Sequence, residues 1–327
     1  MKLSEVGELA LLETVRKKFT KKTTGLVLGI GDDAAVISPR GKQTLLATDM
    51  MVEGVHFDLD WTTPYQAGFK LVSVNVSDIY AMGGRPSFLL LNFAAAENTD
   101  IKVFKRLFDG VALALKTYNV TLIGGDISSS GEMVLSATVI GHSDRILRRS
   151  GARRGDNIYV TGRLGDAAAG LELMKIIKKP VEIEKNRTTD FPLKWDIIKS
   201  LIERHLMPVA RRPVKFADKA TSMIDISDGL LLDLSRICAE SGTGASIFLE
   251  KIPVSEGLVK AAEYLGTLPH EFALGGGEDY ELLFTAPPQE KVDAFCIGEI
   301  TGRGLEIIDK TGKAEKFKLK GYRHFAG

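Results

Sequence analysis

Hydrophobic and polar positions follow two periodicities along the chain, and these predict an alternation of helices and strands. Thr63-Pro64 starts a segment with apolar residues at helical spacing, which should run to Met82 and stop at Gly83-Gly84. A strand over 88–96, a helix over 99–118 and strands near 120–123 and 133–141 follow. The first half therefore combines helices with strands.

Three short apolar runs precede this region. They cover Leu26–Ile30, Ala34–Ile37 and Gln43–Thr48. Pro39-Arg40-Gly41 is typical of a turn, so the second and third runs are expected to pair as a hairpin.

A basic, glycine-rich segment from Ser143 to Asp156 separates two regions of dense pattern. It places a domain boundary between residues 143 and 144, giving domains 1–143 and 144–327. In the second half we expect a strand over 158–161, a loop or insertion over 178–195, and four helices. The helices are predicted at 166–177, 196–206, 213–221 and from Asp228-Gly229 to Gly242. Strands mixed with helices in both halves indicate an α/β or α+β class.

Composition agrees with a folded protein of two domains. The 327 residues are 44% hydrophobic and 26% charged, and the net charge of +1 gives no field that would favour nucleic acid. Two cysteines exclude a disulfide framework and a cysteine-rich zinc site. The longest apolar run, Phe88–Ala96, is far shorter than the roughly 20 residues that cross a bilayer. The acidic N-terminal segment is unlike a signal peptide. We therefore expect a soluble cytoplasmic protein without membrane or nucleic-acid partners.

Acidic residues recur beside glycines or at strand ends, and this is the main chemical signal. A single such residue is usually only a turn former. Several carboxylates can converge only if cations hold them, because like charges otherwise raise each other's pKa values. Oxygen ligands without His or Cys favour Mg²⁺, whose shell is often completed by substrate phosphates. The placements are Asp32-Asp33, Asp49, Asp126, Asp225, Asp228 and Glu278-Asp279.

Two polar residues share one face of the apolar helix predicted to end at Met82. Asn75 and Asp78 are spaced i,i+3. They either form a buried polar stripe that needs partners or simply face water, and the pattern alone does not separate these alternatives.

The motifs of several other nucleotide-binding classes are missing from the sequence. Gly29-Ile30-Gly31 fits the start of a dinucleotide fingerprint, but two aspartates and a strand follow it instead of a helix. A P-loop motif and an H-E-x-x-H metal motif do not occur. Asp228-Gly229 opens a helix and is interpreted first as an ordinary N-cap, with phosphate binding by backbone N–H groups as the alternative.

Eight motifs in order make the sequence resemble the thiamine-monophosphate kinases, a family of the superfamily that includes aminoimidazole ribonucleotide synthetase and selenophosphate synthetase. The motifs are Gly29–Ala34, Thr48–Asp49 with Gly54–Phe57, Val74–Asp78 with Ala81–Gly83, Leu122–Asp126, Arg149–Ala152, Ile224–Leu230, Gly276–Leu282 and Lys320–Phe325. Two positions depart from the usual family pattern: Ala47 stands where the family often has Ser, and Ile127-Ser128 where it often has Thr-Thr.

The resemblance implies a two-domain fold like that of aminoimidazole ribonucleotide synthetase, with an N-terminal domain that binds Mg²⁺ and ATP and a C-terminal α/β domain. It implies a homodimer whose N-terminal sheets join, and ATP-dependent conversion of thiamine monophosphate to thiamine diphosphate. The residues that match Mg²⁺ ligands are Asp33, Thr48, Asp49, Asp78, Asp126 and Asp225, with Asp228 for a further ion. Those that match ATP positions are Gly125, Asp126, Arg149 and Ser227, and those that match thiamine phosphate positions are His56, Glu278 and Tyr322.

The expected chemistry needs no general base, because a phosphate oxygen of thiamine monophosphate is already anionic near neutral pH. Two alternatives stay open. One is a sister enzyme that uses ATP to activate an amide or formyl oxygen. The other is a nucleotide-binding scaffold without activity, against which the retained acidic placements argue. Selenophosphate synthesis is disfavoured because both cysteines, Cys238 and Cys296, lie in the second half.

Overall fold

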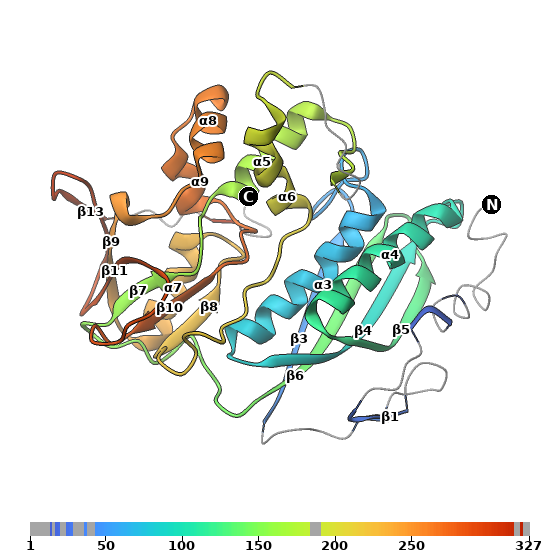
Figure 1. The fold of residues 1–327 in the computed structure, drawn as a ribbon, viewed down its shortest axis with the longest axis horizontal. Helices are drawn as coiled ribbons and strands as arrows, with labels where there is room; N and C mark the ends of the chain where they lie inside the picture. Colours follow the sequence, from blue (N-terminus) through green and yellow to red (C-terminus); the bar gives the residue numbers. More distant parts are fainter. Residues whose placement is uncertain are drawn as a thin grey trace. The chain divides into compact units, whose positions relative to one another are not determined.

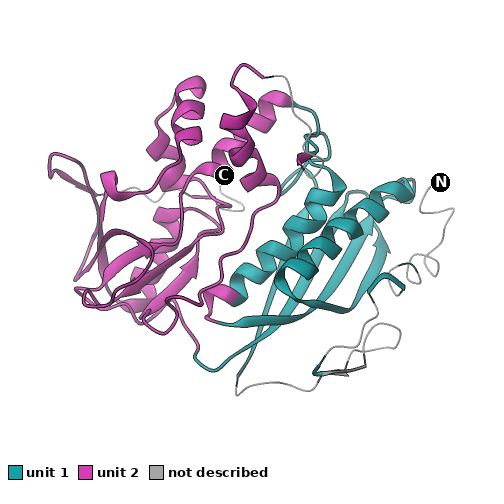
Figure 2. Ribbon diagram, in the orientation of Figure 1, with its two compact units in different colours: residues 1–79, 84–145, 178–182 teal, residues 80–83, 146–177, 183–327 magenta. Residues whose placement is uncertain are grey.

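The computed structural model describes residues 14, 17–19, 24–28, 36–37, 43–183, 191–316 and 321–322 of the chain. Two compact units divide these residues (Figure 1, Figure 2). Unit 1 comprises residues 1–79, 84–145 and 178–182, and unit 2 comprises residues 80–83, 146–177 and 183–327. The main division after residue 145 lies beside the sequence-predicted boundary at 143/144.

Unit 1 is built on a four-stranded sheet of order β3-β6-β4-β5. Its elements are β1 (Leu26–Leu28), β2 (Val36–Ile37), β3 (Gln43–Val52), α3 (Pro64–Ala81), β4 (Arg85–Ala95), α4 (Ile101–Tyr118), β5 (Thr121–Ser129) and β6 (Val134–Ser143). The predicted helices at 63–82 and 99–118 and the strand at 88–96 are confirmed. The strand pairs are antiparallel except β4 with β5, which run parallel.

Two helices, α3 and α4, cover one face of this sheet (Figure 1). Every second residue of β6 is buried, as expected for a sheet with one covered face. Phe93 of β4 meets Phe104 of α4 edge to face, with ring centroids 5.2 Å apart. Asp100 caps α4 by accepting from the Lys102 N–H, and Asn119 ends the helix in the left-handed conformation. These contacts fix the covered face of the sheet.

The predicted hairpin between Ala34–Ile37 and Gln43–Thr48 is wrong. β2 pairs antiparallel with β1 instead. β3 is longer than predicted, and it pairs with β6 along its whole length from Gln43 to Val52. β3 therefore pairs with a strand about ninety residues away in the sequence and not with the run just before the turn. The reason is that β6 satisfies the backbone hydrogen bonds of β3 along its whole length.

Unit 2 contains a seven-stranded sheet of order β13-β12-β9-β11-β7-β10-β8. Its strands are β7 (Asn157–Val160), β8 (Ser222–Asp225), β9 (Gly244–Phe248), β10 (Leu282–Ala286), β11 (Phe295–Thr301), β12 (Leu305–Ile308) and β13 (Ala314–Lys316). Its helices are α5 (Asp166–Ile177), α6 (Trp195–Leu206), α7 (Leu230–Ser241), the short 3-10 helix η2 (Leu249–Lys251), α8 (Glu256–Leu265) and α9 (Pro269–Gly275). Among the described strands of this sheet, β12 and β9 pair in parallel and the other neighbouring pairs are antiparallel.

Most helices predicted in the second half are confirmed. α7 begins after Gly229 and ends at Gly242, which adopts φ 66° as its C-cap. The helix predicted at 213–221 is wrong, because this segment forms consecutive turns. The backbone hydrogen bonds of this segment are short-range. For example, the N–H groups of Phe216 and Ala217 donate to the Pro213 carbonyl. Among the described residues, no helix is long and apolar enough to cross a membrane.

Candidate active site

In unit 1, α3 and β3 are joined at the predicted metal ligand Asp49. The backbone N–H of Asp49 donates to Asn75 Oδ1 at 3.0 Å, and Asn75 Nδ2 donates to the Leu71 carbonyl at 2.9 Å. Asn75 is fully buried, whereas Asp78 on the same helix face is half-buried. The polar stripe of α3 is therefore a buried one with partners, and it places Asp78 toward the strand that carries Asp49.

Replacing Asn75 by alanine should lower the free energy of unfolding by about 1–3 kcal/mol, because the Asp49 N–H and the Leu71 carbonyl would both lose a buried partner. Urea denaturation would measure the change. Asn98→Ala is the matched control, since its side chain is exposed in the turn between β4 and α4 and its loss should change stability by about 0.5 kcal/mol or less. Equal losses in the two variants would contradict this role of Asn75.

Two further predicted ligands, Thr48 and Asp126, lie on the opposite face of the sheet. Asp126 pairs with Asn92 of β4, and Thr48 pairs with Thr138 of β6. Asp49, in contrast, is paired with the buried Ala137 on the face covered by the helices. β3 and β5 form the two edges of the sheet, roughly 14 Å apart, so the structure does not bring Asp126 and Asp49 together.

Gly124-Gly125 precedes Asp126 inside β5, where the sequence suggested the end of a strand. Gly125 has a packing reason to be glycine. Its φ is 154°, and a Cβ atom there would lie 1.7 Å from the Leu91 carbonyl oxygen. An ATP contact at Gly125 stays a prediction.

His56 follows β3 in a tight turn. Its Nδ1 accepts from the Val52 N–H at 3.1 Å, which leaves Nε2 as the protonated nitrogen of a neutral ring. The side chain is half-buried. Asp33 falls outside the described residues.

In unit 2, two loops run side by side and gather predicted site residues. The N–H groups of Glu278 and Tyr280 donate to the carbonyls of Ser227 and Ile226, at 2.8 and 3.0 Å. The Tyr322 N–H donates to the Asp228 carbonyl at 3.0 Å. Backbone hydrogen bonds therefore bring together the residues of unit 2 that are predicted to contact ATP, metal and thiamine phosphate.

Gly277 and Gly229 allow this close approach. A Cβ atom on Gly277 would lie 2.5 Å from the Ser227 carbonyl, and one on Gly229 would lie 2.9 Å from the Gly275 carbonyl. Gly229 has φ 119°, which L-residues rarely adopt. The glycines of these motifs therefore allow the two loops to lie close enough to form their backbone hydrogen bonds.

The start of α7 concentrates negative charge. Asp233 Oδ2 accepts from the N–H groups of Asp228 and Gly229, both at 3.1 Å. Burial, followed by the neighbouring charge of Asp225, raises the pKa of Asp233 to about 7. Arg236 pairs with Asp228 and Asp233, each at 2.6 Å. Gly229 is the N-cap residue of α7 and no side chain caps the helix from that position, so the expected N-cap is not found. The N–H groups of Asp228 and Gly229 donate to Asp233 within the helix, which also argues against phosphate binding at these two N–H groups.

Arg149 lies apart from this loop pair. Its carbonyl accepts from Ser241 Oγ at 3.3 Å, at the C-terminal end of α7, and its side chain is exposed. Ser227 and Asp228 precede the other end of this helix, which is about 18 Å long. An ATP contact by Arg149 stays a prediction.

A buried ionic cluster beside the loops was not predicted from sequence. Glu281 is fully buried, and its Oε1 accepts from Arg204 Nη1 at 2.7 Å. Arg211 binds the same carboxylate through Nε and Nη2, and Thr161 Oγ1 donates to it at 2.6 Å. Only the unusual density of acidic residues in Glu278–Glu281 hinted at such partners.

Asp279 completes the anchoring of this loop. Its carboxylate accepts from the N–H groups of Gly165 and Ala167 at 2.6 and 3.1 Å, at the start of α5. Burial raises the pKa of Asp279 to about 7, although the two N–H donors favour its charged form. Asp279 and Glu281 thus hold the loop, and Glu278 between the paired loops keeps a partly exposed carboxylate.

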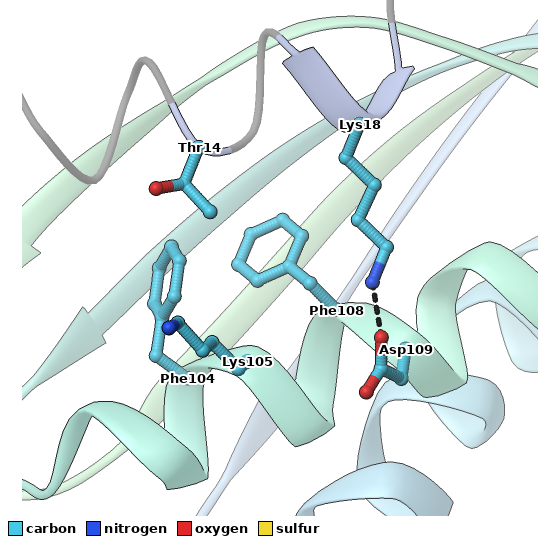
Figure 3. Close-up of a pocket in the computed structure, with 6 residues that line it drawn as sticks. All are labelled: Thr14, Lys18, Phe104, Lys105, Phe108 and Asp109. Atoms are coloured by element: carbon cyan, nitrogen blue, oxygen red, sulfur yellow. Dashed lines mark hydrogen bonds and ion pairs between the residues drawn. The ribbon is translucent and has the colours of Figure 1, made fainter.

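Over the described ranges, no three acidic, His or Cys side chains are grouped closely enough to hold a metal ion by themselves. A cavity of about 250 Å³ lies beside α4 in unit 1 (Figure 3). It is lined by Thr14, Lys18, Phe104, Lys105, Phe108 and Asp109. None of these is a predicted site residue, so this cavity is separate from the candidate site.

The chain matches both domains of one class of protein. Residues 31–143 match AIR synthase related protein, N-terminal domain, and residues 153–314 match AIR synthase related protein, C-terminal domain. A curated relative, the thiamine-monophosphate kinase of Aquifex aeolicus, is 38% identical over 331 residues, covering 99% of this chain and all of the relative. The chain belongs to the thiamine-monophosphate kinase family.

Solved structures agree with this assignment. One described as AaThiL complexed with AMPPCP and TMP has a TM-score of 0.76 and 35% identity, with 99% of each chain covered. The thiamine-monophosphate kinase of Stenotrophomonas maltophilia K279a has a TM-score of 0.78 and 31% identity, with 96% of this chain and 99% of that chain covered. The two-domain α+β fold implied by the sequence motifs is confirmed.

Proposed function

We propose that this protein transfers the terminal phosphoryl group of ATP to thiamine monophosphate, forming thiamine diphosphate and ADP. The observation that carries the proposal is full-length similarity to a kinase whose structure holds AMPPCP, an ATP analogue, together with TMP. The paired loops of unit 2 and the Asp49–Asn75 contact of unit 1 support it, because they occur at the motifs that the family shares.

The acceptor supplies its own nucleophile. A phosphate oxygen of thiamine monophosphate attacks the terminal phosphorus of ATP in line, and the bond from that phosphorus to the bridging oxygen of ADP breaks. The oxygen is anionic near neutral pH, so the protein does not need a general base and no residue is assigned that role. The protein's part is to position two anionic phosphates and reduce their repulsion.

The acidic residues fit Mg²⁺ because they are hard oxygen donors. Asp225 and Asp228 lie near Asp233, whose pKa is raised first by burial and then by the charge of Asp225. When bound, Mg²⁺ would neutralise phosphate charge during transfer. Asp49 and Asp126 belong to separate metal positions, because their strands form opposite edges of the sheet. The residues proposed as ligands are Asp33, Thr48, Asp49, Asp78, Asp126, Asp225 and Asp228.

Different residues are proposed to contact the two substrates, ATP and thiamine monophosphate. The residues proposed for ATP are Gly125, Asp126, Arg149 and Ser227. Arg149 offers a planar guanidinium suited to phosphate oxygens. His56, Glu278 and Tyr322 are proposed for thiamine monophosphate. A carboxylate such as that of Glu278 suits the amino or cationic ring end of this substrate and would repel its phosphate.

We also propose a homodimer that forms through the face of the unit 1 sheet opposite α3 and α4. Leu46 and Met50 of β3 are 69% and 55% exposed on that face, next to the row of Thr48 and Thr138. Large apolar side chains on one sheet face are typical of an interface. A reducing, cytoplasmic location is supported by the two cysteines, Cys238 and Cys296, which are free thiols.

Acceptor choice tests the proposed function. Magnesium-dependent ADP release should occur with thiamine monophosphate and not with unphosphorylated thiamine, the matched control that lacks the nucleophilic phosphate. ADP release with neither compound, but with an amide- or formyl-bearing acceptor, would indicate the sister-enzyme alternative. Nucleotide binding without any turnover would indicate the scaffold alternative.

A further inference from the structure

The loop that carries Glu278 is held in an uncommon backbone conformation. Glu278 and Tyr280 have φ values of 66° and 49°, in the left-handed region that residues other than glycine seldom adopt. Such residues persist only when surrounding contacts determine them, and they concentrate at ligand-binding sites. The loop therefore needs anchors on both sides of Glu278.

One side of the loop is held by Ser227 and Ile226, as described above. The other side is held by the last turn of α6, where Arg204 donates to the Asp279 carbonyl at 3.2 Å and to Glu281 Oε1 at 2.7 Å. α6 itself is closely packed on α5. A Cβ atom on Gly170 of α5 would lie 2.2 Å from the Leu201 carbonyl. The end of α6 is thus a rigid support for the loop.

The neighbouring residue of this turn reaches the carboxylate of Glu278. His205 Nδ1 lies 3.1 Å from Glu278 Oε2, within ion-pair range, although the angles are outside those of a hydrogen bond. The His205 side chain is 5% exposed and that of Glu278 is 28% exposed. A buried ring nitrogen faces a carboxylate that still reaches solvent. A proton on Nδ1 would give this contact the character of an ion pair.

We propose that His205 is a positioning residue that orients the Glu278 carboxylate toward the amino or cationic ring end of thiamine monophosphate. This inference rests on the proposed function. His205 is buried behind the carboxylate, while Arg204 fixes the backbone on which Glu278 stands. Preorganisation by a second residue lowers the entropy that substrate binding must otherwise overcome.

Removing the ring should weaken acceptor binding without changing nucleotide binding. We expect His205→Leu to raise the Kd and KM for thiamine monophosphate about tenfold, with the KM for ATP and kcat changed less than about twofold. His205→Gln keeps a side-chain N–H donor of similar reach and should retain most of the affinity. Calorimetric titration of the full-length protein with thiamine monophosphate measures binding independently of turnover.

A double-mutant cycle separates positioning from a general structural effect. In the Glu278→Gln background, His205→Leu should cause no further loss of affinity, because the carboxylate that it orients is gone. His270→Leu is the control, since it removes a half-buried histidine at the start of α9, outside the proposed site, and should leave acceptor affinity unchanged. Thermal unfolding checks that each variant is folded, and His205→Phe, which keeps an aromatic ring without a ring nitrogen, replaces a leucine variant that fails to fold.

Unchanged affinity in His205→Leu, or an equal loss with and without Glu278, would overturn the inference. So would equal rises in KM for ATP and for thiamine monophosphate. If the wild-type protein itself neither binds nor phosphorylates thiamine monophosphate, the proposed function is wrong. If the wild-type protein is active and only the cycle fails, the role of His205 alone is wrong.

Discussion

Replacing Asp49 by asparagine should lower kcat for phosphorylation of thiamine monophosphate by about 100-fold or more, while the protein stays folded. The effect is large because a carboxylate that holds Mg²⁺ acts on the charge of the transferring phosphoryl group, and loss of one such electrostatic contact typically costs about 10²–10³ in rate. Folding should survive, because the Asp49 contact with Asn75 is made by the backbone N–H, which asparagine keeps. Steady-state kinetics at saturating ATP would measure the loss.

The matched control for this variant is Asp109→Asn. Asp109 is an exposed carboxylate of α4 that pairs with Lys18 beside the cavity of unit 1 (Figure 3). Its neutralisation should leave kcat unchanged. Raising the Mg²⁺ concentration should restore part of the activity of Asp49→Asn, because a weakened site is refilled by mass action. Wild-type turnover in Asp49→Asn at ordinary Mg²⁺ would contradict the metal role.

Replacing Glu281 by leucine should destabilise unit 2 by about 3–5 kcal/mol, the usual cost of removing one partner from a buried ionic cluster. Glu281 is fully buried and receives bonds from Arg204, Arg211 and Thr161. The lower end of the range is expected, because the Arg211 side chain is 41% exposed and can regain water. Arg204, which is 16% exposed, would keep an uncompensated charge.

Denaturant unfolding followed by fluorescence would measure this loss. Glu263→Leu on the exposed surface of α8 is the control and should change stability by about 0.5 kcal/mol or less. If the free energy of unfolding falls by less than about 1 kcal/mol in Glu281→Leu, the arginines tolerate the loss of the carboxylate and the expected cost of breaking the cluster is contradicted. Acceptor affinity should fall in the same variant, since the loop carries Glu278.

The sequence correctly predicted those elements whose formation depends on residues that are close together in the chain. The helix over 166–177 and the helix from Leu230 to Ser241 follow from apolar spacing and, in the second case, a glycine C-cap. The hairpin over 34–48 failed because the partner of β3 lies far along the chain in β6. The segment 213–221 failed because Pro213 and its neighbours make separate turns, which a periodicity count does not distinguish from one helix.

The candidate site divides in the same way. The sequence motifs predicted which residues carry the chemistry, and a buried Asn75–Asp78 stripe with partners was one of two open alternatives. The face on which Asp126 lies depends on strand register, which motifs do not contain. The support by Arg204 and His205 could not be predicted, because these residues of α6 meet the Glu278–Glu281 loop only in the folded chain.

A product assay tests the proposed function most directly. The full-length protein is incubated with ATP, Mg²⁺ and thiamine monophosphate, with and without EDTA, and ADP and thiamine diphosphate are quantified together. We predict equal amounts of the two products and no formation of either when EDTA removes the metal. ADP without thiamine diphosphate, or thiamine diphosphate formed equally well in EDTA, would contradict the proposed reaction.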